Sequence, residues 1–462
     1  MLEKIRNNKT VAAICAYIDS PIFPAVLGVA ALLFYILALP MVGLVAFGLV
    51  FAFVFFFSND TRPALAVALL AFLTLRYKYD VGAYLSTPAI VCYCVFGPGV
   101  LASIVVRFIA YERPKHNHGV LLGLVLMCTA LFFGGAFSDY YRIHNVYNAL
   151  ALTGGFCGVY VLFSYTLKHR EDNLVYVARI CTVALCVIAV QVLDFYIREY
   201  KMGTPLDGDW KQKILLGWGI SNLVGEMSAM LFPAVFYLIY KENRGYLYYL
   251  AVVVGYVAVY FTLGRNALIC SSVVVVVGIV VNCFVGKNRK ANASIAVAIL
   301  VVGLIVILSL KEAGKFKLLL AFFANKKLDD NGRFKIWKEY IKLFKENPVL
   351  GVGFAAHRIV YPGQPLNAHN TLLQMLSSTG IVGLALYLFH RFQTVVLFVK
   401  KPSFDRLFVG SCLITGVIAS LLDPLFFRTY FTIYYAALLL VIEKSSEYDE
   451  RKTKLFQPKH KK

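Results

Sequence analysis

Residues 293–310 have the sequence ASIAVAILVVGLIVILSL, which carries no charged side chain. A run of this length and apolarity spans the ~30 Å hydrocarbon core of a bilayer as an α-helix. Similar blocks fill the chain, and 60% of its 462 residues are hydrophobic while 15% are charged, against roughly 45–50% and about 25% in ordinary globular domains. This composition excludes a soluble enzyme, a disordered chain and a disulfide-stapled secreted domain. It predicts an all-α polytopic membrane helix bundle.

Fourteen apolar ranges are predicted to form membrane-spanning helices: 21–38, 41–57, 63–76, 82–108, 118–137, 147–167, 174–198, 214–240, 246–263, 266–286, 293–310, 371–391, 404–422 and 429–443. Because one range is short and another is interrupted by Gly97-Pro98-Gly99, we expect about 12–14 transmembrane helices. The chain then divides into an N-terminal membrane bundle of about 11 spans, a long loop, C-terminal membrane helices and a basic tail, at 1–310, 311–370, 371–443 and 444–462.

The charge distribution predicts the orientation of these helices. Lys and Arg number 46 against 25 Asp and Glu, giving a formal charge of +21. The charged residues lie between apolar blocks. Membrane topology and binding to anionic lipid headgroups therefore explain the excess of positive charge better than nucleic-acid binding does. One set of short connections holds 25 basic residues and the opposite set holds nine. The bias predicts a multi-pass protein with both termini cytoplasmic and the 311–370 loop extracytoplasmic.

The sequence gives no sign of a metal site or a cofactor. Nine of the ten cysteines fall inside predicted spans, and Cys92 and Cys94 are spaced to face different sides of a helix. His116-Asn117-His118 lies on the predicted inner side, away from any acid or cysteine cluster, and is expected to be a solvated loop. No nucleotide-binding glycine loop occurs. Any substrate is therefore expected to be lipid-borne or extracytoplasmic.

The 311–370 loop carries a formal charge of +6 and contains a predicted amphipathic helix from Arg333 to Pro348. Aromatic and aliphatic residues recur there at three- and four-residue spacing, with lysines and glutamates between them. The predicted apolar face consists of Phe334, Trp337, Tyr340, Ile341 and Phe344. Such a helix either lies at the membrane interface or caps the bundle, and the pattern favours neither.

The end of this loop holds several candidate site residues. In Gly351-Val352-Gly353 a tight turn lets the backbone approach a ligand or another helix. Asn370 or Thr371 can cap the following helix, which leaves His369 unexplained. A histidine at this surface can act as a base or hydrogen-bond donor near neutral pH, or it is simply solvated.

Three further residues are candidates because of their position in or near the predicted spans. Arg265, between two spans that leave almost no loop, can bind phosphate in two-point fashion or can snorkel to set helix depth. Glu226 is the only acid deep in a predicted helix, so it is expected to line a cavity or to pair with a neighbour such as Asn222. Asp423, at an outer helix end, is expected to be a solvated cap.

The order of these segments resembles the O-antigen ligase and O-antigen polymerase superfamily of bacterial membrane glycosyltransferases. The resemblance covers roughly residues 260–390. Its segments are Leu263-Gly264-Arg265-Asn266-Ala267-Leu268, Arg333-Phe334-Lys335-Ile336-Trp337, Asn347-Pro348-Val349-Leu350-Gly351-Val352-Gly353, Ala368-His369-Asn370-Thr371-Leu372-Leu373-Gln374 and Gly380-Ile381-Val382-Gly383-Leu384. The family often has a small residue where this chain has Asn266.

The resemblance implies a layout like that of C-type glycosyltransferases and transfer of a glycan from undecaprenyl pyrophosphate to an acceptor hydroxyl, with inversion and without a metal. It assigns Arg265 and Arg333 to the pyrophosphate and His369 to the acceptor hydroxyl, which makes these three the expected catalytic residues. Arg265, Arg333, Asn370, Gly351, Gly353 and Glu226 are the expected substrate-binding residues.

The resemblance also implies a location and partners. We expect a bacterial inner membrane protein whose partners are the lipid-linked donor, a glycan or lipid acceptor and membrane lipids, with a chain-length regulator and a flippase as further candidates. A surface polysaccharide polymerase is slightly favoured over an O-antigen-type ligase. The alternative class is a lipid-linked sugar flippase or another multi-span transporter.

Overall fold

A computed structural model describes residues 8–76, 87–203, 214–312, 333–354, 367–400 and 402–456. Within these ranges the chain is almost entirely helical, and its two short strands pair antiparallel, Leu215 with Ile220 and Leu216 with Gly219. The predicted all-α polytopic bundle is therefore confirmed. The predicted span 214–240 needs a correction at its start, because 215–220 forms this hairpin and the helix begins at Ser221.

The N-terminal part of the chain contains α2 (Lys9–Ile18), α3 (Phe23–Ile36), α4 (Pro40–Phe57), α5 (Arg62–Leu70), η1 (Ala71–Thr74), α7 (Thr87–Ala110), α8 (Leu121–Phe133), α9 (Ile143–Thr153), η2 (Gly154–Gly158), α10 (Val159–Ser164) and α11 (Asn173–Lys201). The remaining elements are β1 (Leu215–Leu216), β2 (Gly219–Ile220), α13 (Ser221–Lys241), η3 (Gly245–Tyr248), α14 (Tyr249–Phe261), α15 (Arg265–Val285), α16 (Arg289–Glu312), α18 (Arg333–Glu346), α20 (Thr371–Lys400), α21 (Phe404–Ala419), η4 (Leu425–Phe427) and α22 (Thr429–Phe456).

In the described part of the chain, fewer helices qualify as membrane spans than the sequence predicts. Each of the fourteen apolar ranges contains a helix, but among the described residues only eight helices are long and apolar enough to cross a membrane. A ninth is possible if α2 and α3, which are bent by 83° at their junction, count as one span. Other ranges hold shorter apolar helices such as α8. Apolarity alone does not separate a full span from a short helix buried in the bundle.

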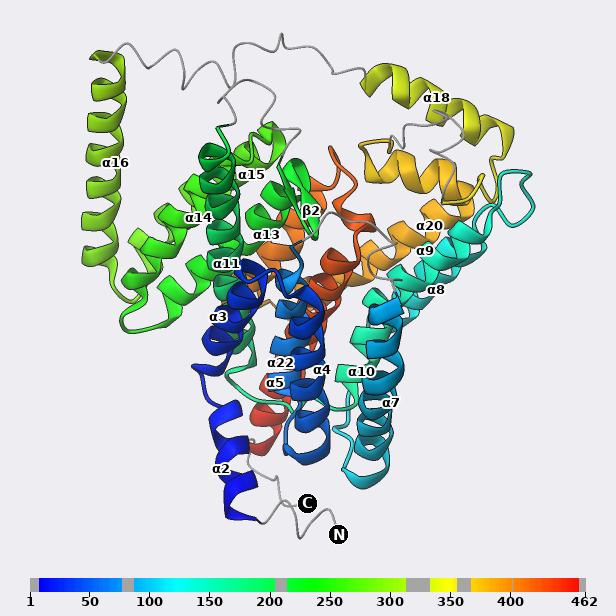
Figure 1. Cartoon of the computed structure of the whole chain (residues 1–462), viewed down its shortest axis with the longest axis horizontal. Helices are drawn as coiled ribbons and strands as arrows, with labels where there is room; N and C mark the ends of the chain where they lie inside the picture. Colours follow the sequence, from blue (N-terminus) through cyan, green and yellow to red (C-terminus); the bar gives the residue numbers. More distant parts are fainter. Residues whose placement is uncertain are drawn as a thin grey trace, which may run out of the picture.

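The two ends of the bundle carry different elements (Figure 1). Helix α2 and the C-terminal end of α22 lie at one end, and the amphipathic α18 lies at the opposite end. Helix α13 is buried along almost its whole length, and it packs against α11, α14, α15 and α21. A helix that is apolar on all sides is expected in such a central position.

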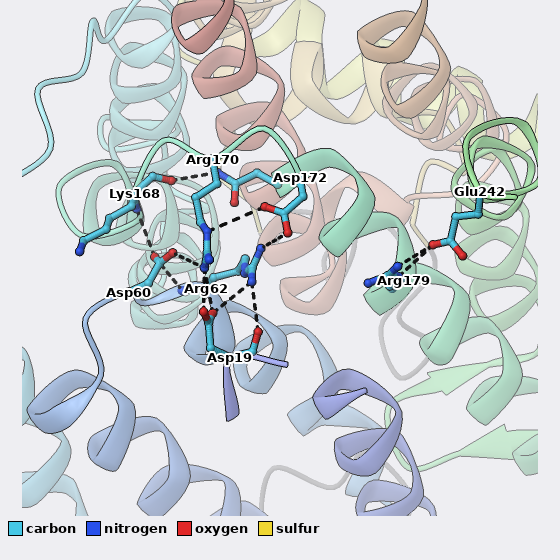
Figure 2. Close-up of polar contacts among 9 residues, drawn as sticks. Asp19, Asp60, Arg62, Lys168, Arg170, Asp172, Arg179 and Glu242 are labelled. Carbon is cyan, nitrogen blue, oxygen red and sulfur yellow. Dashed lines mark hydrogen bonds and ion pairs between the residues drawn. The ribbon is translucent and has the colours of Figure 1, made fainter. Parts of the chain in front are cut away.

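The polar residues at the α2 end form a network of ion pairs (Figure 2). Arg62, whose side chain is 4% exposed, lies 3.1 Å from Asp19 and 2.6 Å from Asp172. Arg170 pairs with Asp19 and Asp60. Burial opposes the charge of Arg170, but its hydrogen bond to Asp19 and the nearby carboxylates outweigh this effect and raise the pKa of its guanidinium. The network joins α2, the α4–α5 turn and the segment before α11.

The prediction of a solvated loop at 116–118 is wrong. The His116 side chain is fully buried, and its Nε2 lies 3.1 Å from Oε2 of Glu443 in α22. Glu443 also accepts hydrogen bonds from the Gly119 backbone N–H (2.7 Å) and the Tyr160 hydroxyl. A local sequence pattern could not predict this cluster, because Glu443 comes more than three hundred residues after His116.

Candidate functional site

Helix α20 positions the first candidate residue, His369, just before its N-terminus. The residues on both sides of His369 are fixed by hydrogen bonds. The Ala368 N–H donates to Gln374 Oε1 (3.0 Å), the Ala368 carbonyl accepts from Trp337 Nε1 of α18 (2.8 Å), and Asn370 Oδ1 accepts from the Leu373 N–H (2.9 Å). His369 itself has φ +49°, a left-handed conformation that is unfavourable for residues other than glycine. The hydrogen bonds of the neighbouring residues Ala368 and Asn370 maintain this conformation.

The His369 side chain meets the carboxylate of Asp423. His369 Nδ1 donates to Asp423 Oδ1 over 2.5 Å, and Nη2 of Arg333 lies 3.6 Å from Oδ2 of the same carboxylate. Asn222 Nδ2, at the start of α13, donates to Oδ2 over 3.0 Å. Three residues from different parts of the sequence therefore converge on the carboxylate of Asp423.

Asp423 is buried, with only 3% of its side chain exposed, whereas the side chains of His369 and Arg333 are about a quarter exposed. The prediction that Asp423 is a solvated helix cap is therefore wrong. Three residues before Asp423, the end of α21 is joined to the start of α20, because Thr371 Oγ1 donates to the carbonyl of Ser420 over 2.6 Å. The structure thus supplies a histidine with one imidazole nitrogen bound to a buried acid and its side chain partly open to solvent.

Glu226 lies beside this centre but has a different partner from the one expected. Asn222 pairs with Asp423 instead, and Glu226 Oε1 accepts from Asn266 Nδ2 over 2.7 Å. Asn266 Nδ2 also donates to the carbonyl of Ala419 over 2.8 Å. The Asn266 amide therefore joins α15 to both α13 and α21. Asn266 is the residue that stands where the family often has a small one. Glu226 is fully buried.

Arg265 is the first residue of α15, directly before Asn266. Its side chain is partly exposed, and within the described ranges it makes no hydrogen bond or ion pair. This placement leaves the guanidinium available to an anion at the same end of the bundle as Asn266 and Glu226.

Gly351 and Gly353 pack against α20. Both have positive φ values, +71° and +96°, and the backbone N–H groups of Val352 and Gly353 donate to the carbonyls of Ser377 and Ser378 over 2.9 Å. A Cβ on Gly351 would lie 2.4 Å from the carbonyl carbon of Ser378. Close approach to another helix, one of the two uses expected from the sequence, accounts for both glycines.

The helix predicted from Arg333 is confirmed as α18, but its buried face differs from the expected one. Ile336, Tyr340 and Leu343 are buried, whereas Phe334 is 62% exposed and Ile341 is 42% exposed. The helix therefore caps the bundle with one stripe while its other apolar residues remain exposed.

An apolar groove of about 490 Å³ lies between α13, α15 and α21. Its lining includes Cys270, whose Sγ lies 3.6 Å from Asn266 Oδ1, and continues along α15 to Val281. At the rise of an α-helix, the distance from Cys270 to Val281 is about 16 Å. The groove therefore begins one helical turn from the Asn266–Glu226 pair and follows the membrane-spanning helices.

The described residues contain no group of three or more His, Cys, Asp or Glu side chains arranged to hold a metal ion. The fold and the site define a helical membrane protein with a histidine–aspartate–arginine centre at the end of the bundle that carries α18. Residues 250–388 match the family model described as O-antigen ligase. Over this stretch the chain is therefore similar to the O-antigen ligase family. A comparison with curated proteins finds no match.

The match includes Arg265, Arg333, Gly351, Gly353, His369 and Asn370 and nearly coincides with the 260–390 stretch that carries the resemblance. Asn222, Glu226 and Asp423 lie outside it. Sequence reasoning missed the contact between Asp423 and His369, because no local signal distinguishes a buried aspartate after a helix from a solvated one.

Proposed function

We propose that the protein transfers a glycan from undecaprenyl pyrophosphate to an acceptor hydroxyl at the extracytoplasmic face of the bacterial inner membrane. The observation that carries the proposal is the convergence of His369, Asp423 and Arg333. The family implies a lipid-linked glycan donor and a glycan or lipid acceptor. The positive-inside bias supports placing α18, and with it this centre, on the outer side.

His369 is suited to act as the general base. Asp423 accepts a hydrogen bond from the N–H group at Nδ1 of His369. Nε2 therefore keeps a lone pair that can take the proton of the acceptor hydroxyl. The acceptor oxygen then bonds to the anomeric carbon as the carbon–oxygen bond to pyrophosphate breaks. The electron pair leaves with the pyrophosphate, and the proton remains on His369. A single displacement of this kind inverts the anomeric centre.

The leaving group gains negative charge, and two arginines are available to stabilise it. Arg265 has no partner in the described part of the chain, and Arg333 faces Asp423 at 3.6 Å. Fixed cations near a developing charge lower a barrier by several kcal/mol where water is excluded. The two guanidinium groups would supply positive charge from the protein itself.

The apolar groove supports a donor with a polyprenyl chain. With its pyrophosphate near Arg265, the donor's chain would enter the groove beside Cys270 and continue toward Val281. Replacing Val277, which lines the groove, with Trp should weaken use of an undecaprenyl donor and spare a donor with a short prenyl chain. The matched control is Val276→Trp, because Val276 is 60% exposed and lies outside the lining.

Transfer by the purified full-length protein in proteoliposomes tests the proposal. Wild type should release undecaprenyl pyrophosphate and form a glycosylated acceptor, and His369→Ala should abolish both. Full activity of His369→Ala would overturn the assignment of the base. Donor crossing the bilayer without any transfer product would instead support a transporter.

Polymerase and ligase are separated in a deletion strain complemented with wild type or His369→Ala. We favour the polymerase, for which loss of activity leaves single repeat units on the final acceptor and no long chains. Long chains that accumulate on the carrier and are missing from the acceptor would identify a ligase.

A further inference from the structure

Arg391 is an arginine inside the bundle that the site described above does not use. Arg391 is the last residue of the predicted span 371–391, but α20 continues for nine more residues to Lys400, about 13 Å. Its contact on α22, Tyr435, lies six residues after Thr429, where that helix begins. Arg391 is therefore well inside the membrane-spanning part, where a charged side chain is unfavourable unless its surroundings stabilise it.

Three aromatic rings surround the guanidinium. Its Cζ lies 4.6 Å from the ring centre of Tyr387, 4.8 Å from that of Phe426 and 5.0 Å from that of Tyr435. Arg391 Nη1 donates to the Tyr435 hydroxyl over 2.7 Å. Among the described residues no carboxylate pairs with Arg391, and its Nε and Nη2 are buried without a hydrogen-bond partner. Cation–π attraction is therefore the main interaction that holds this charge.

One of these rings belongs to the turn that carries Asp423. Phe426 follows Asp423 by three residues, and the turn is closed by a hydrogen bond from the Leu425 N–H to the Asp423 carbonyl (2.9 Å). The Phe426 ring also packs on Phe156 at 4.9 Å and on Tyr387 at 5.3 Å. The Arg391 guanidinium thus contacts the turn from the interior of the bundle.

We propose that Arg391 is a positioning residue for the proposed glycosyl transfer. It fixes Phe426 between α20 and α22, and it thereby holds the Asp423 turn so that Oδ1 stays on His369 Nδ1. A planar cation attracts ring faces from three segments at once, whereas an apolar side chain of the same size fills the space without orienting them. The inference rests on the proposed function, in which Asp423 orients the base.

The test compares Arg391→Met, Arg391→Lys and wild type as full-length proteins in the transfer assay. Methionine keeps most of the volume and removes the charge, and we expect kcat to fall about tenfold or more while the donor KM stays within about twofold. Lysine keeps the charge without the planar group and should restore part of the loss. Arg179→Met, which removes an arginine paired with Glu242 elsewhere in the bundle, is the matched control.

A double variant separates positioning from general destabilisation. If Arg391 acts through Asp423, then Arg391→Met combined with Asp423→Asn should be no more than about twofold slower than Asp423→Asn alone, because coupled residues are non-additive. A wild-type kcat for Arg391→Met, a rise in KM alone, or fully multiplicative losses in the double variant would overturn the inference. If Asp423→Asn is as active as wild type, the proposed role of the His369–Asp423 pair fails first.

Discussion

Replacing Asp423 with Asn tests the centre most directly, because the two side chains have nearly the same shape. Asp423 Oδ1 accepts from His369, while Oδ2 accepts from Asn222 and faces Arg333. If the amide oxygen of the substituted side chain faces His369, its NH₂ group faces the two donors Asn222 and Arg333. The opposite orientation places NH₂ against Nδ1, so the imidazole proton must move to Nε2, where it blocks the base.

The expected loss follows from these contacts. A hydrogen bond to a charged group contributes about 1.5–3 kcal/mol, and removing that much transition-state stabilisation lowers kcat roughly 10- to 150-fold. Because Asp423 is buried, solvent screening should not reduce the effect much. The donor KM should change by no more than about threefold, since the acid acts on the base rather than on the donor.

The assay is steady-state release of undecaprenyl pyrophosphate by the full-length protein in proteoliposomes, with thermal unfolding measured in parallel. Asp405→Asn is the control, because Asp405 lies in the first turn of α21, the helix that Asp423 follows, and makes a partly exposed ion pair with Lys241. A kcat for Asp423→Asn within about twofold of wild type, at unchanged stability, would refute the reasoning.

Three further changes have expected outcomes in equilibrium unfolding. Gly380→Ala should lower the free energy of unfolding by about 1–3 kcal/mol, because Gly380 has φ +66° and the added Cβ would lie 2.1 Å from the Val349 carbonyl oxygen. Arg62→Met should lower it by about 1.5–3 kcal/mol, since it removes the hydrogen bonds between a buried guanidinium and the charged Asp19 and Asp172. Trp337→Phe removes the hydrogen bond to the Ala368 carbonyl, so it should lower stability by about 1 kcal/mol and also reduce kcat.

Each of these changes has a matched control. Gly303→Ala, in a helix where nothing lies within 4 Å of the added carbon, should be neutral or stabilising. Equal losses at Gly303 and Gly380 would contradict the role of the backbone conformation. Arg179→Met should lower stability by less than about 1 kcal/mol, and a loss as large as that of Arg62→Met would contradict the burial argument. Trp218→Phe also removes an indole hydrogen bond, and an equal fall in kcat would exclude a specific role for Trp337.

Much of the candidate site could be predicted because several of its signals are local. The apolar blocks, the amphipathic pattern after Arg333 and the capping residues before α20 depend on neighbours within a few residues. The same signals marked His369 as a residue without a structural explanation. They did not predict which face of α18 is buried, because Phe334 and Ile336 are both apolar and only the position of α20 decides between them.

The sequence by itself determined that this is an all-α membrane protein with a basic, helix-containing loop, since hydrophobicity over about 20 residues decides membrane insertion. The tertiary structure alone decided the polar partners. Asp423 meets His369 across 54 residues and Glu226 meets Asn266 across 40, while Arg391 lies inside the bundle rather than at its edge. Burial and pairing depend on how distant helices pack, and no local pattern in one chain records that arrangement.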